Sequence, residues 1–297
     1  MAPPAAARVR CPAKINLGLW ILGERPDGYH EIDTIVQAVA LEDDLVVTRG
    51  GDGLSLEVAG LPIPGPGTNI VERAFDLLRN EAGSRATGLK VQLTKRIPVG
   101  GGLGGGSSDA AGFLAAASAI WGLGLGAEDL ESLGARLGSD VPFFVRGGTA
   151  RATGRGERVR HLCPLPPAWI VLATPPVAVS TTWAYGRAKI ALTLQGGSAS
   201  MLAVAIERRD WLAIASHLHN DFEDVVLPEF GVVARLRRVL EESGVLGSLL
   251  SGSGSTVFGL ARTQEEAQLA ARRVAALGAA VHVVRTTERG VALAELR

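Results

Sequence analysis

A glycine-rich run at residues 98–109 has the composition of a phosphate-binding loop. It reads Pro-Val-Gly-Gly-Gly-Leu-Gly-Gly-Gly-Ser-Ser-Asp, between an expected strand (residues 89–94) and an expected helix (about residues 110–121). Glycines let backbone N–H groups approach a ligand without interference from a Cβ atom. Free N–H groups and the dipole at a helix N-terminus favour an anion, so the run predicts a phosphate cradle. Ser107 and Ser108 add hydroxyl donors, or a ligand for Mg²⁺.

Two familiar phosphate loops do not fit this run. A P-loop requires Gly-x-x-x-x-Gly-Lys-Ser/Thr, and no lysine lies between Gly100 and Ser108. The spacing Gly100-x-Gly102-x-x-Gly105 matches a dinucleotide fingerprint, but six glycines in seven positions match such patterns trivially, and the βαβ context is weak. A flexible linker is the alternative, although a linker seldom lies between a strand and a very apolar helix.

Two charged residues elsewhere could have either an ordinary or a chemical role. Lys14 lies in a short strand in which apolar residues alternate from Ile15 to Leu19. Because lysine is rarely buried without a partner, the residues alone favour a solvated edge position. Asp140 follows an expected helix stop in the segment Gly-Ser-Asp-Val-Pro-Phe-Phe (138–144), where a carboxylate usually caps a helix or forms a turn.

The elements that must position these residues alternate without a regular βαβ repeat. Strands are expected at residues 36–41, 45–49, 54–58, 89–94, 169–173, 256–260, 281–285 and 291–296. Helices are expected at residues 70–81, 110–121, 128–137, 199–217, 232–242 and 263–277, the first and last opened by the capping boxes Asn69/Glu72 and Thr263/Glu266. This mixture favours an α+β fold. The Gly-, Arg- and Pro-rich stretch 147–167 is the expected boundary between domains at residues 1–160 and 161–297.

The composition excludes several classes of protein. With 47% hydrophobic and 20% charged residues, a chain of 297 residues is not largely disordered. A formal net charge of zero gives no global reason to expect nucleic acid or an anionic membrane as a partner. Cys11 and Cys163 make no disulfide framework and no metal cluster. We expect a cytoplasmic protein with no signal peptide, no membrane span and no obligate protein partner.

Three segments together resemble the three motifs of the GHMP small-molecule kinases. They are Pro12-Ala-Lys-Ile-Asn-Leu-Gly-Leu19, the glycine-rich run, and Leu250-Ser-Gly-Ser-Gly-Ser-Thr256. A further segment, Arg25-Pro-Asp-Gly-Tyr-His-Glu31, resembles that of the 4-diphosphocytidyl-2-C-methyl-D-erythritol kinases of the non-mevalonate isoprenoid pathway. The match follows the family order over nearly the whole chain. It implies a two-domain GHMP kinase-like fold, with a nucleotide-binding domain first, a substrate-side domain second, and the active site in the cleft between them.

The resemblance implies ATP-dependent phosphorylation of the 2-hydroxyl of the methylerythritol unit. Asp140 matches the general base of the family, and an alcohol must lose its proton as it attacks phosphorus. Lys14 matches the lysine beside that base, where it helps to orient the base and the acceptor hydroxyl. A nearby ammonium group would also keep the carboxylate ionised.

The same resemblance implies a small-molecule cytidyl diphosphate substrate. Tyr29 and Tyr185 would stack on the two faces of cytosine, with Trp183 as the weaker choice for the second face. Stacking tolerates any base, so selection requires hydrogen bonds to the base edge, which His30 is placed to supply. Asn16 would contact the methylerythritol hydroxyls.

The ATP site implied by the resemblance is more extensive. Asn69 would cap its helix and also contact adenine. Lys95 could reach the nucleotide phosphates, and a solvated lysine at the strand end is the equal alternative. The segment 251–255 is expected to be a tight turn that supports the glycine loop. The cradle itself would comprise Pro98, Val99, Gly100, Gly101, Gly102, Leu103, Gly104, Gly105, Gly106, Ser107 and Ser108.

The chain departs from the family pattern in the ligands expected for the metal ion. ATP requires Mg²⁺ to neutralise its β- and γ-phosphates. Many GHMP kinases hold that ion with a serine of the glycine motif and a separate glutamate, and no glutamate here can be assigned to this role. The ligands of the Mg²⁺ ion are therefore left unassigned.

Two other functions fit parts of the sequence. One is a GHMP kinase for another alcohol, such as homoserine or mevalonate; the Gly-Tyr-His segment argues against it, since neither substrate carries a base to stack. The other is a non-catalytic nucleotide-binding module. The presence of both Lys14 and Asp140 argues against this second alternative.

Overall fold

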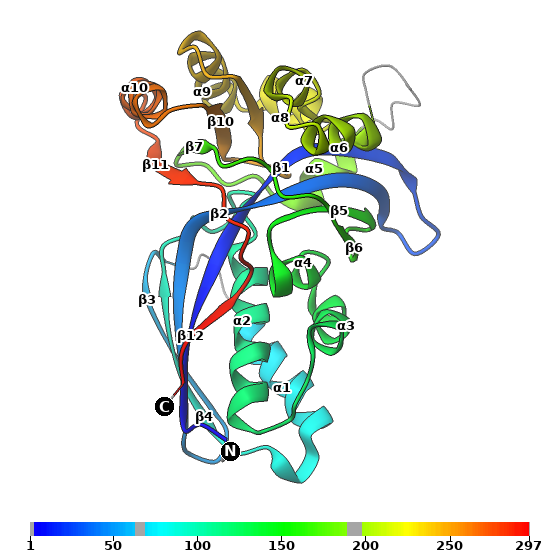
Figure 1. The fold of residues 1–297 in the computed structure, drawn as a ribbon, viewed down its shortest axis with the longest axis vertical. Helices are drawn as coiled ribbons and strands as arrows, with labels where there is room; N and C mark the ends of the chain where they lie inside the picture. Colours follow the sequence, from blue (N-terminus) through cyan, green and yellow to red (C-terminus); the bar gives the residue numbers. More distant parts are fainter. Residues whose placement is uncertain (1–2, 63–68, 189–197, 297) are drawn as a thin grey trace.

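Two very long strands lie at the centre of the larger sheet of the molecule. The computed structural model describes residues 3–62, 69–188 and 198–296. In it, β1 (Ala6–Glu24) pairs antiparallel with β2 (His30–Arg49), and together they run through most of the molecule's length (Figure 1). They are the centre of an eight-stranded sheet of order β12-β1-β2-β4-β3. Its other members are β3 (Leu54–Gly60), β4 (Leu89–Lys95), β5 (Thr149–Gly154), β6 (Arg158–His161), β8 (His219–Asn220) and β12 (Ala292–Leu296).

A layer of helices covers one face of this sheet. It consists of α1 (Ile70–Ala82), α2 (Gly105–Ile120), α3 (Ala127–Leu137) and α4 (Val141–Arg146), with the 3₁₀ turn η1 (Gly83–Arg85) after α1. The alanines and glycine of α2 let it lie close to β1, since a Cβ atom on Gly112 would come within 2.5 Å of Cys11 Sγ. Buried aromatic rings of Phe75, Phe113 and Phe144 fill the space between the helices and the sheet. This packing fixes where the N-terminus of α2 points.

A second, four-stranded antiparallel sheet lies at the other end of the molecule (Figure 1). Its order is β11-β7-β10-β9, with β7 (Trp169–Thr174), β9 (Gly247–Leu250), β10 (Val257–Ala261) and β11 (Ala280–Arg285). The helices of this half are α5 (Thr181–Arg187), α6 (Ala199–Glu207), α7 (Trp211–Ser216), α8 (Glu223–Glu229), α9 (Gly231–Glu242) and α10 (Gln264–Ala275). The predicted α+β class is confirmed, since the described residues form two sheets with helices packed on them.

Several expected elements have different bounds. The strands expected at 36–41 and 45–49 are parts of the single strand β2, and β1 extends far beyond the short strand expected around Lys14. The helix expected at 199–217 is broken after residue 207, where Arg209 has a positive φ and Asp210 caps α7. The capping boxes at Asn69 and Thr263 are confirmed. Hydrophobic periodicity locates a helix but does not show such a break.

The C-terminal strand returns to the first sheet. β12 pairs antiparallel with β1, so residues 292–296 lie beside residues 7–10 (Figure 1). The stretch 147–167, expected to be a boundary, holds β5 and β6, and the division at residue 160 falls inside β6. The sheets therefore do not divide the chain into two sequential halves. Among the described residues, no helix is long and apolar enough to cross a membrane.

Candidate active site

A cleft of about 1400 Å³ brings the motifs of the sequence together. Its walls include the glycine loop, the start of α2, the middle of β1, the β1–β2 turn and the segments that precede α4 and contain α5. Almost all of the residues expected to act are among its lining: Lys14, Asn16, Tyr29, His30, Asn69, Lys95, Pro98 to Ser107, Asp140 and Tyr185. Segments more than a hundred residues apart thus share one site.

Hydrogen bonds to backbone carbonyls of the glycine loop join the three motifs to one another. The Lys14 N–H donates a hydrogen bond of 2.9 Å to the carbonyl of Leu103 in the glycine loop. Ser251 Oγ donates to the carbonyl of Gly102 at 3.0 Å, and the Thr256 N–H donates to the carbonyl of Gly101 at 3.2 Å. The expectation that residues 251–255 support the loop is confirmed by these bonds.

Lys14 and Asp140 form the charged centre of the cleft. Lys14 Nζ lies 3.8 Å from Asp140 Oδ2 and donates a hydrogen bond of 2.5 Å to Asn16 Oδ1. The Lys14 side chain is buried, whereas that of Asp140 is 44% exposed to the cleft. Asn16 Nδ2 donates in turn to Thr34 Oγ1 at 2.9 Å. Lys14 is therefore not the solvated edge residue that its sequence context favours, because it has buried polar partners.

Asp140 owes its position to the junction between two helices. Helix α3 ends at Leu137, and Asp140 is the N-cap residue of the short helix α4, whose second residue is Pro142. Proline in the first turn of a helix costs no backbone hydrogen bond. The Asp140 side chain makes no capping hydrogen bond to α4, so its carboxylate is available to the cleft.

The glycine loop presents the N-terminus of α2 to the cleft. Helix α2 starts at Gly105, five residues earlier than expected, and its N-cap residue Gly104 has a left-handed backbone with φ of 70°. A Cβ atom on Gly104 would lie 2.7 Å from the Phe144 ring and 3.1 Å from Lys14 Cγ. Only glycine fits both the φ angle and the space at this position.

The two serines of the run differ in their surroundings. Ser107 lines the cleft. Ser108 is fully buried, donates its N–H to the Gly104 carbonyl, and its hydroxyl has no hydrogen-bond partner among the described residues. Of the two hydroxyls, that of Ser107 is the one that a nucleotide or its metal ion could reach.

Lys95 belongs to a buried cluster of charges beneath the loop. Its ammonium group is 2.6 Å from Asp109 Oδ2 and also pairs with Asp43, and all three side chains are almost fully buried. The alternative of a solvated lysine is therefore wrong. Burial opposes the charge on Lys95, but attraction to Asp109 and Asp43 outweighs it and raises its pKa. Burial raises the pKa of Asp109 to about 8, against the attraction of Lys95.

Asn69 caps α1 at the far side of the loop. Its Oδ1 accepts the Val71 N–H at 3.0 Å, and its own N–H donates to Glu72 Oε2 at 2.7 Å. The first bond occupies the Asn69 side-chain oxygen and the second the Asn69 backbone N–H, and the residue also lines the cleft. We call this part of the cleft, formed by Asn69 and the glycine loop, the nucleotide end, after the ligand that the sequence predicts there.

The other part of the cleft is aromatic, with Tyr29, His30, Tyr185 and Phe222 in its lining, and we call it the base end, after the cytosine that the resemblance implies there. The rings of His30 and Tyr185 lie 4.8 Å apart, and Phe222 packs edge-on against Tyr185, also at 4.8 Å. Tyr29 is 52% exposed. Burial, and secondarily the charge of Asp140, raise the pKa of Tyr185 to about 12, so its hydroxyl stays protonated. The other candidate for the second stacking face packs away from these rings, since Trp183 contacts Phe230 and Arg187.

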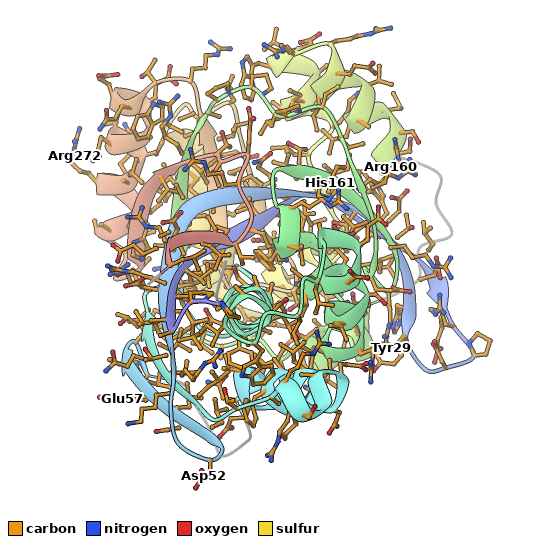
Figure 2. The ribbon with its side chains drawn as sticks, turned by 60° about the horizontal axis from the view of Figure 1, so that its bottom comes forward. Tyr29, Asp52, Glu57, Arg160, His161 and Arg272 are labelled. Carbon is orange, nitrogen blue, oxygen red and sulfur yellow. The ribbon has the colours of Figure 1, made fainter. Side chains whose placement is uncertain are left out.

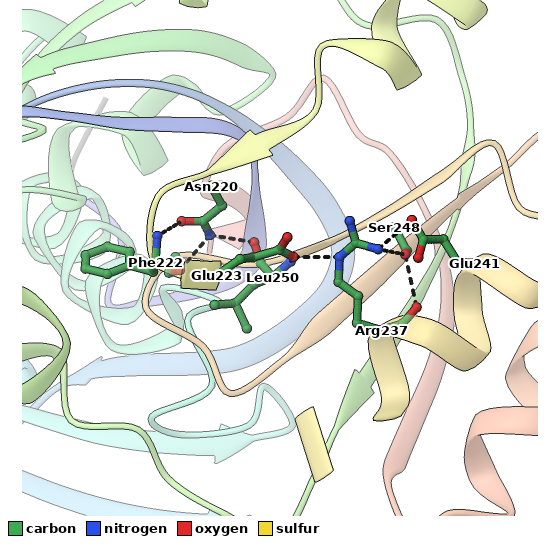
Figure 3. Close-up of polar contacts among 8 residues, drawn as sticks. Asn220, Phe222, Glu223, Arg237, Glu241, Ser248 and Leu250 are labelled. Carbon is green, nitrogen blue, oxygen red and sulfur yellow. Dashed lines mark hydrogen bonds and ion pairs between the residues drawn. The ribbon is translucent and has the colours of Figure 1, made fainter. Parts of the chain in front are cut away.

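Sequence reasoning missed Phe222, which lies in the turn between β8 and α8. Asn220 fixes this turn: its Oδ1 accepts the Phe222 N–H, and its Nδ2 donates to the carbonyls of Leu250 and Gly252 (Figure 3). The same network therefore holds an aromatic wall of the base end and the 251–255 turn. The Leu250 N–H donates to Glu223, which is paired with Arg237 (Figure 3). No sequence motif links Phe222 to the cleft; the pairing of β8 with β1 and the bonds of Asn220 bring it there.

Arg155 was also missed. It lies between β5 and β6, lines the cleft, and places its guanidinium carbon 4.9 Å from the centre of the Tyr29 ring. The pattern Thr153-Gly-Arg-Gly-Glu157 indicates a turn but not its direction.

The fold and the site define a GHMP kinase. Residues 69–148 match the family described as GHMP kinases N terminal domain, and residues 202–280 match GHMP kinases C terminal. The chain is 46% identical over 263 residues to a 4-diphosphocytidyl-2-C-methyl-D-erythritol kinase of Synechococcus sp. (strain JA-3-3Ab), with 86% of this chain and 85% of that protein covered. It is 44% identical over 275 residues to the kinase of the same name from Pelotomaculum thermopropionicum, covering 92% and 96%.

A solved structure agrees with these relatives. A crystal structure of 4-(cytidine 5'-diphospho)-2C-methyl-D-erythritol kinase superposes with a TM-score of 0.80 at 34% identity, covering 94% of this chain and 98% of that one. The chain belongs to the 4-diphosphocytidyl-2-C-methyl-D-erythritol kinase family, and it is a small-molecule kinase.

Proposed function

We propose that this kinase transfers the γ-phosphoryl group of ATP to the 2-hydroxyl of 4-diphosphocytidyl-2-C-methyl-D-erythritol, in the non-mevalonate isoprenoid pathway. The observation that carries the proposal is the 3.8 Å approach of Lys14 to Asp140 at the point where the glycine loop meets the aromatic base end. A GHMP kinase for homoserine or mevalonate would have no base to place among Tyr29, His30 and Tyr185.

Asp140 is the general base in this proposal. The acceptor hydroxyl donates its hydrogen bond to the half-exposed carboxylate, which takes the proton as the oxygen attacks the γ-phosphorus. Lys14 holds the carboxylate from one side, and Asn16 fixes Lys14 through their 2.5 Å hydrogen bond. Since Asn16 also lines the cleft, its amide can contact the methylerythritol hydroxyls.

The nucleotide end holds ATP through the backbone. The N–H groups of the loop 100–106 and the N-terminus of α2 would bind the phosphates, and the Ser107 hydroxyl adds a donor. Asn69 and Pro98 line the same part of the cleft, and Asn69 would contact adenine. Lys95 supports the loop from below through the buried cluster rather than as a mobile surface lysine.

Mg²⁺ is the metal that ATP chemistry implies. Within residues 3–62, 69–188 and 198–296, no group of three or more His, Cys, Asp or Glu side chains could hold a metal ion. The residues present therefore fit an ion that would be held mainly by phosphate oxygens and water, with the Ser107 hydroxyl as the oxygen that the glycine loop offers to the cleft. Bound in this way, the ion would neutralise charge on the phosphates.

The test is phosphorus NMR of the purified protein with Mg-ATP and 4-diphosphocytidyl-2-C-methyl-D-erythritol. We expect a new phosphomonoester resonance that grows as ADP forms. Homoserine and mevalonate, supplied separately at the same concentration, should give no such resonance. ATP binding without turnover of the cytidyl substrate would contradict the proposed substrate, and turnover of homoserine or mevalonate would replace it.

A further inference from the structure

The β5–β6 turn carries a basic residue into the cleft. Arg155 lies between Gly154 (φ of 75°) and Gly156 (φ of 110°), and the Gly156 N–H donates to the Thr153 carbonyl at 3.1 Å. The Arg155 N–H donates to Glu157 Oε2 at 2.8 Å. Because both flanking glycines adopt conformations that other residues rarely adopt, the turn is shaped to present this one side chain.

The guanidinium group of Arg155 is held in place at the base end. Its carbon lies 4.9 Å from the centre of the Tyr29 ring, and one terminal nitrogen is 3.5 Å from the carbonyl of Ala135 near the end of α3. A Cβ atom on Gly156 would lie 3.4 Å from Ser139 Cβ, so the turn packs directly against the segment that carries Asp140. Arg155 therefore lies beside both a stacking residue and the catalytic segment.

Arg155 differs in charge balance from the other basic residues of the cleft. Of the lysines and arginines among the described lining residues, Lys14 pairs with Asp140, and Lys95 pairs with Asp43 and Asp109. Arg155 lines the same cleft, and in the described part of the chain its guanidinium group has no carboxylate within 4.0 Å, since the bond to Glu157 is made by the Arg155 backbone N–H. A half-buried guanidinium with no counter-ion in a ligand cleft has free charge to offer to an anionic ligand.

The proposed substrate has an anion at the matching place. In 4-diphosphocytidyl-2-C-methyl-D-erythritol, the diphosphate joins the cytidine to the acceptor alcohol, so it must lie between the base end and Asp140. The cleft carboxylate at that point, Asp140, would repel it. Resting on the proposed function, we propose that Arg155 binds the substrate diphosphate and thereby selects a nucleoside diphosphate derivative over an uncharged nucleoside.

The planar fork of a guanidinium suits this role. It can donate two parallel hydrogen bonds to phosphate oxygens while its flat face rests on an aromatic ring. Tyr29 would thus contact the base and also orient the cation, which links recognition of the base with recognition of the diphosphate.

The experiment measures binding of cytidine 5'-diphosphate and of cytidine by calorimetry, with a non-hydrolysable ATP analogue saturating the nucleotide end. Arg155→Met removes the charge but keeps an unbranched stem over Tyr29. Arg160→Met is the matched control, since Arg160 is exposed on the same hairpin and lies apart from Tyr29 (Figure 2). We expect Arg155→Met to weaken binding of the diphosphate by on the order of ten- to a hundredfold and to leave cytidine binding unchanged. We expect Arg160→Met to bind both ligands as the unmodified chain does.

The other possible results of this experiment would contradict different parts of the proposal. An equal loss for cytidine and cytidine 5'-diphosphate in Arg155→Met would mean that Arg155 only supports the Tyr29 ring, and it would overturn the proposal. Unchanged binding of both ligands would overturn it as well. If the unmodified chain bound neither ligand, the proposed cytidyl substrate itself would be wrong. Unchanged cytidine affinity also shows that the variant is folded at the site.

Discussion

The nucleotide end and the base end of the cleft are built from different parts of the chain. At the nucleotide end, the backbone of the glycine loop forms the surface together with Asn69, and neighbouring segments hold the loop through hydrogen bonds from backbone N–H groups and from the Ser251 hydroxyl. At the base end, side chains from β1–β2, α5, β5–β6 and the β8–α8 turn form the surface. The shape of the first surface depends on the absence of Cβ atoms from its glycines. The shape of the second depends on which side chains come together there.

The junction of the two ends should be the most sensitive point to mutation. Asp140→Asn keeps the shape and the N-cap position but removes the proton acceptor. We expect kcat to fall by about 10²- to 10⁴-fold, with the affinity for ATP unchanged. Steady-state kinetics with nucleotide binding measured in parallel checks this. Asp76→Asn, on the exposed side of α1, is the control and should keep full turnover; an unchanged kcat in Asp140→Asn would remove Asp140 from the mechanism.

A Cβ atom added to the glycine loop of the nucleotide end should strain the backbone and crowd the neighbouring segment. Gly102 has φ of 75°, and a Cβ atom there would lie 2.0 Å from the Ser251 carbonyl oxygen. Gly102→Ala should therefore lower the free energy of unfolding by about 3 kcal/mol, from left-handed strain and overpacking together. It should also raise the KM for ATP, because the loop must separate from the 251–255 turn.

Gly100→Ala is the matched control for this change. Gly100 has nearly the same φ, 72°, but the nearest atom to its Cβ position is 4.0 Å away. It should cost only the strain, about 1 kcal/mol. Urea unfolding of both variants gives the difference. Equal losses would mean that the contact between the loop and Ser251 contributes nothing to the nucleotide end.

At the base end, removal of one side chain should weaken substrate binding and leave the chain folded. Tyr29 is half exposed, so Tyr29→Ala should leave stability nearly unchanged. We expect it to weaken binding of the cytidyl substrate by about 1–3 kcal/mol, the range measured for stacking of bases on aromatic rings. Tyr29→Phe, which keeps the ring, should restore most of the affinity. If only the KM for ATP moved in Tyr29→Ala, the assignment of the two ends would be wrong.

The contrast between the ends also explains what could be predicted from the sequence. The glycine loop is one uninterrupted run whose composition already states its backbone geometry, and the capping boxes at Asn69 and Thr263 are local in the same sense. Lys14 could not be placed from its neighbours, because its partners are the buried Asn16 on the same strand and the half-exposed Asp140 far along the chain. The resemblance to a kinase family supplied that pairing, whereas alternation along the strand did not.

The missed residues share a cause. Phe222 reaches the base end because two residues of β8 pair with β1, and Arg155 because β5 pairs with β2. Both pairings are long-range and depend on register, which one-dimensional periodicity does not specify. The return of β12 to β1 is of the same kind. The sequence predicts short strands in place of the long strands β1 and β2, because the buried middle portions of both lack the alternation of half-buried strands.

The smallest effect that we predict, taken over a single pH unit, lies beneath the nucleotide end, where charged side chains are buried as well as the backbone. The pKa of Asp109 is raised by burial from 3.8 to about 8, so between these values the folded chain holds a proton that the unfolded chain does not. This group's contribution to the free energy of unfolding therefore decreases as pH rises from about 4 to about 8, by at most on the order of 1 kcal/mol per pH unit. Asp109→Asn should flatten that slope in urea unfolding measured at several pH values, while Asp52→Asn, in an exposed loop, should retain it. The same slope in Asp109→Asn as in the unmodified chain would show that Asp109 is charged throughout. The nucleotide end would then rest on a net negative cluster, which is hard to reconcile with a cradle for phosphates, because negative charge below the loop opposes the binding of anions above it.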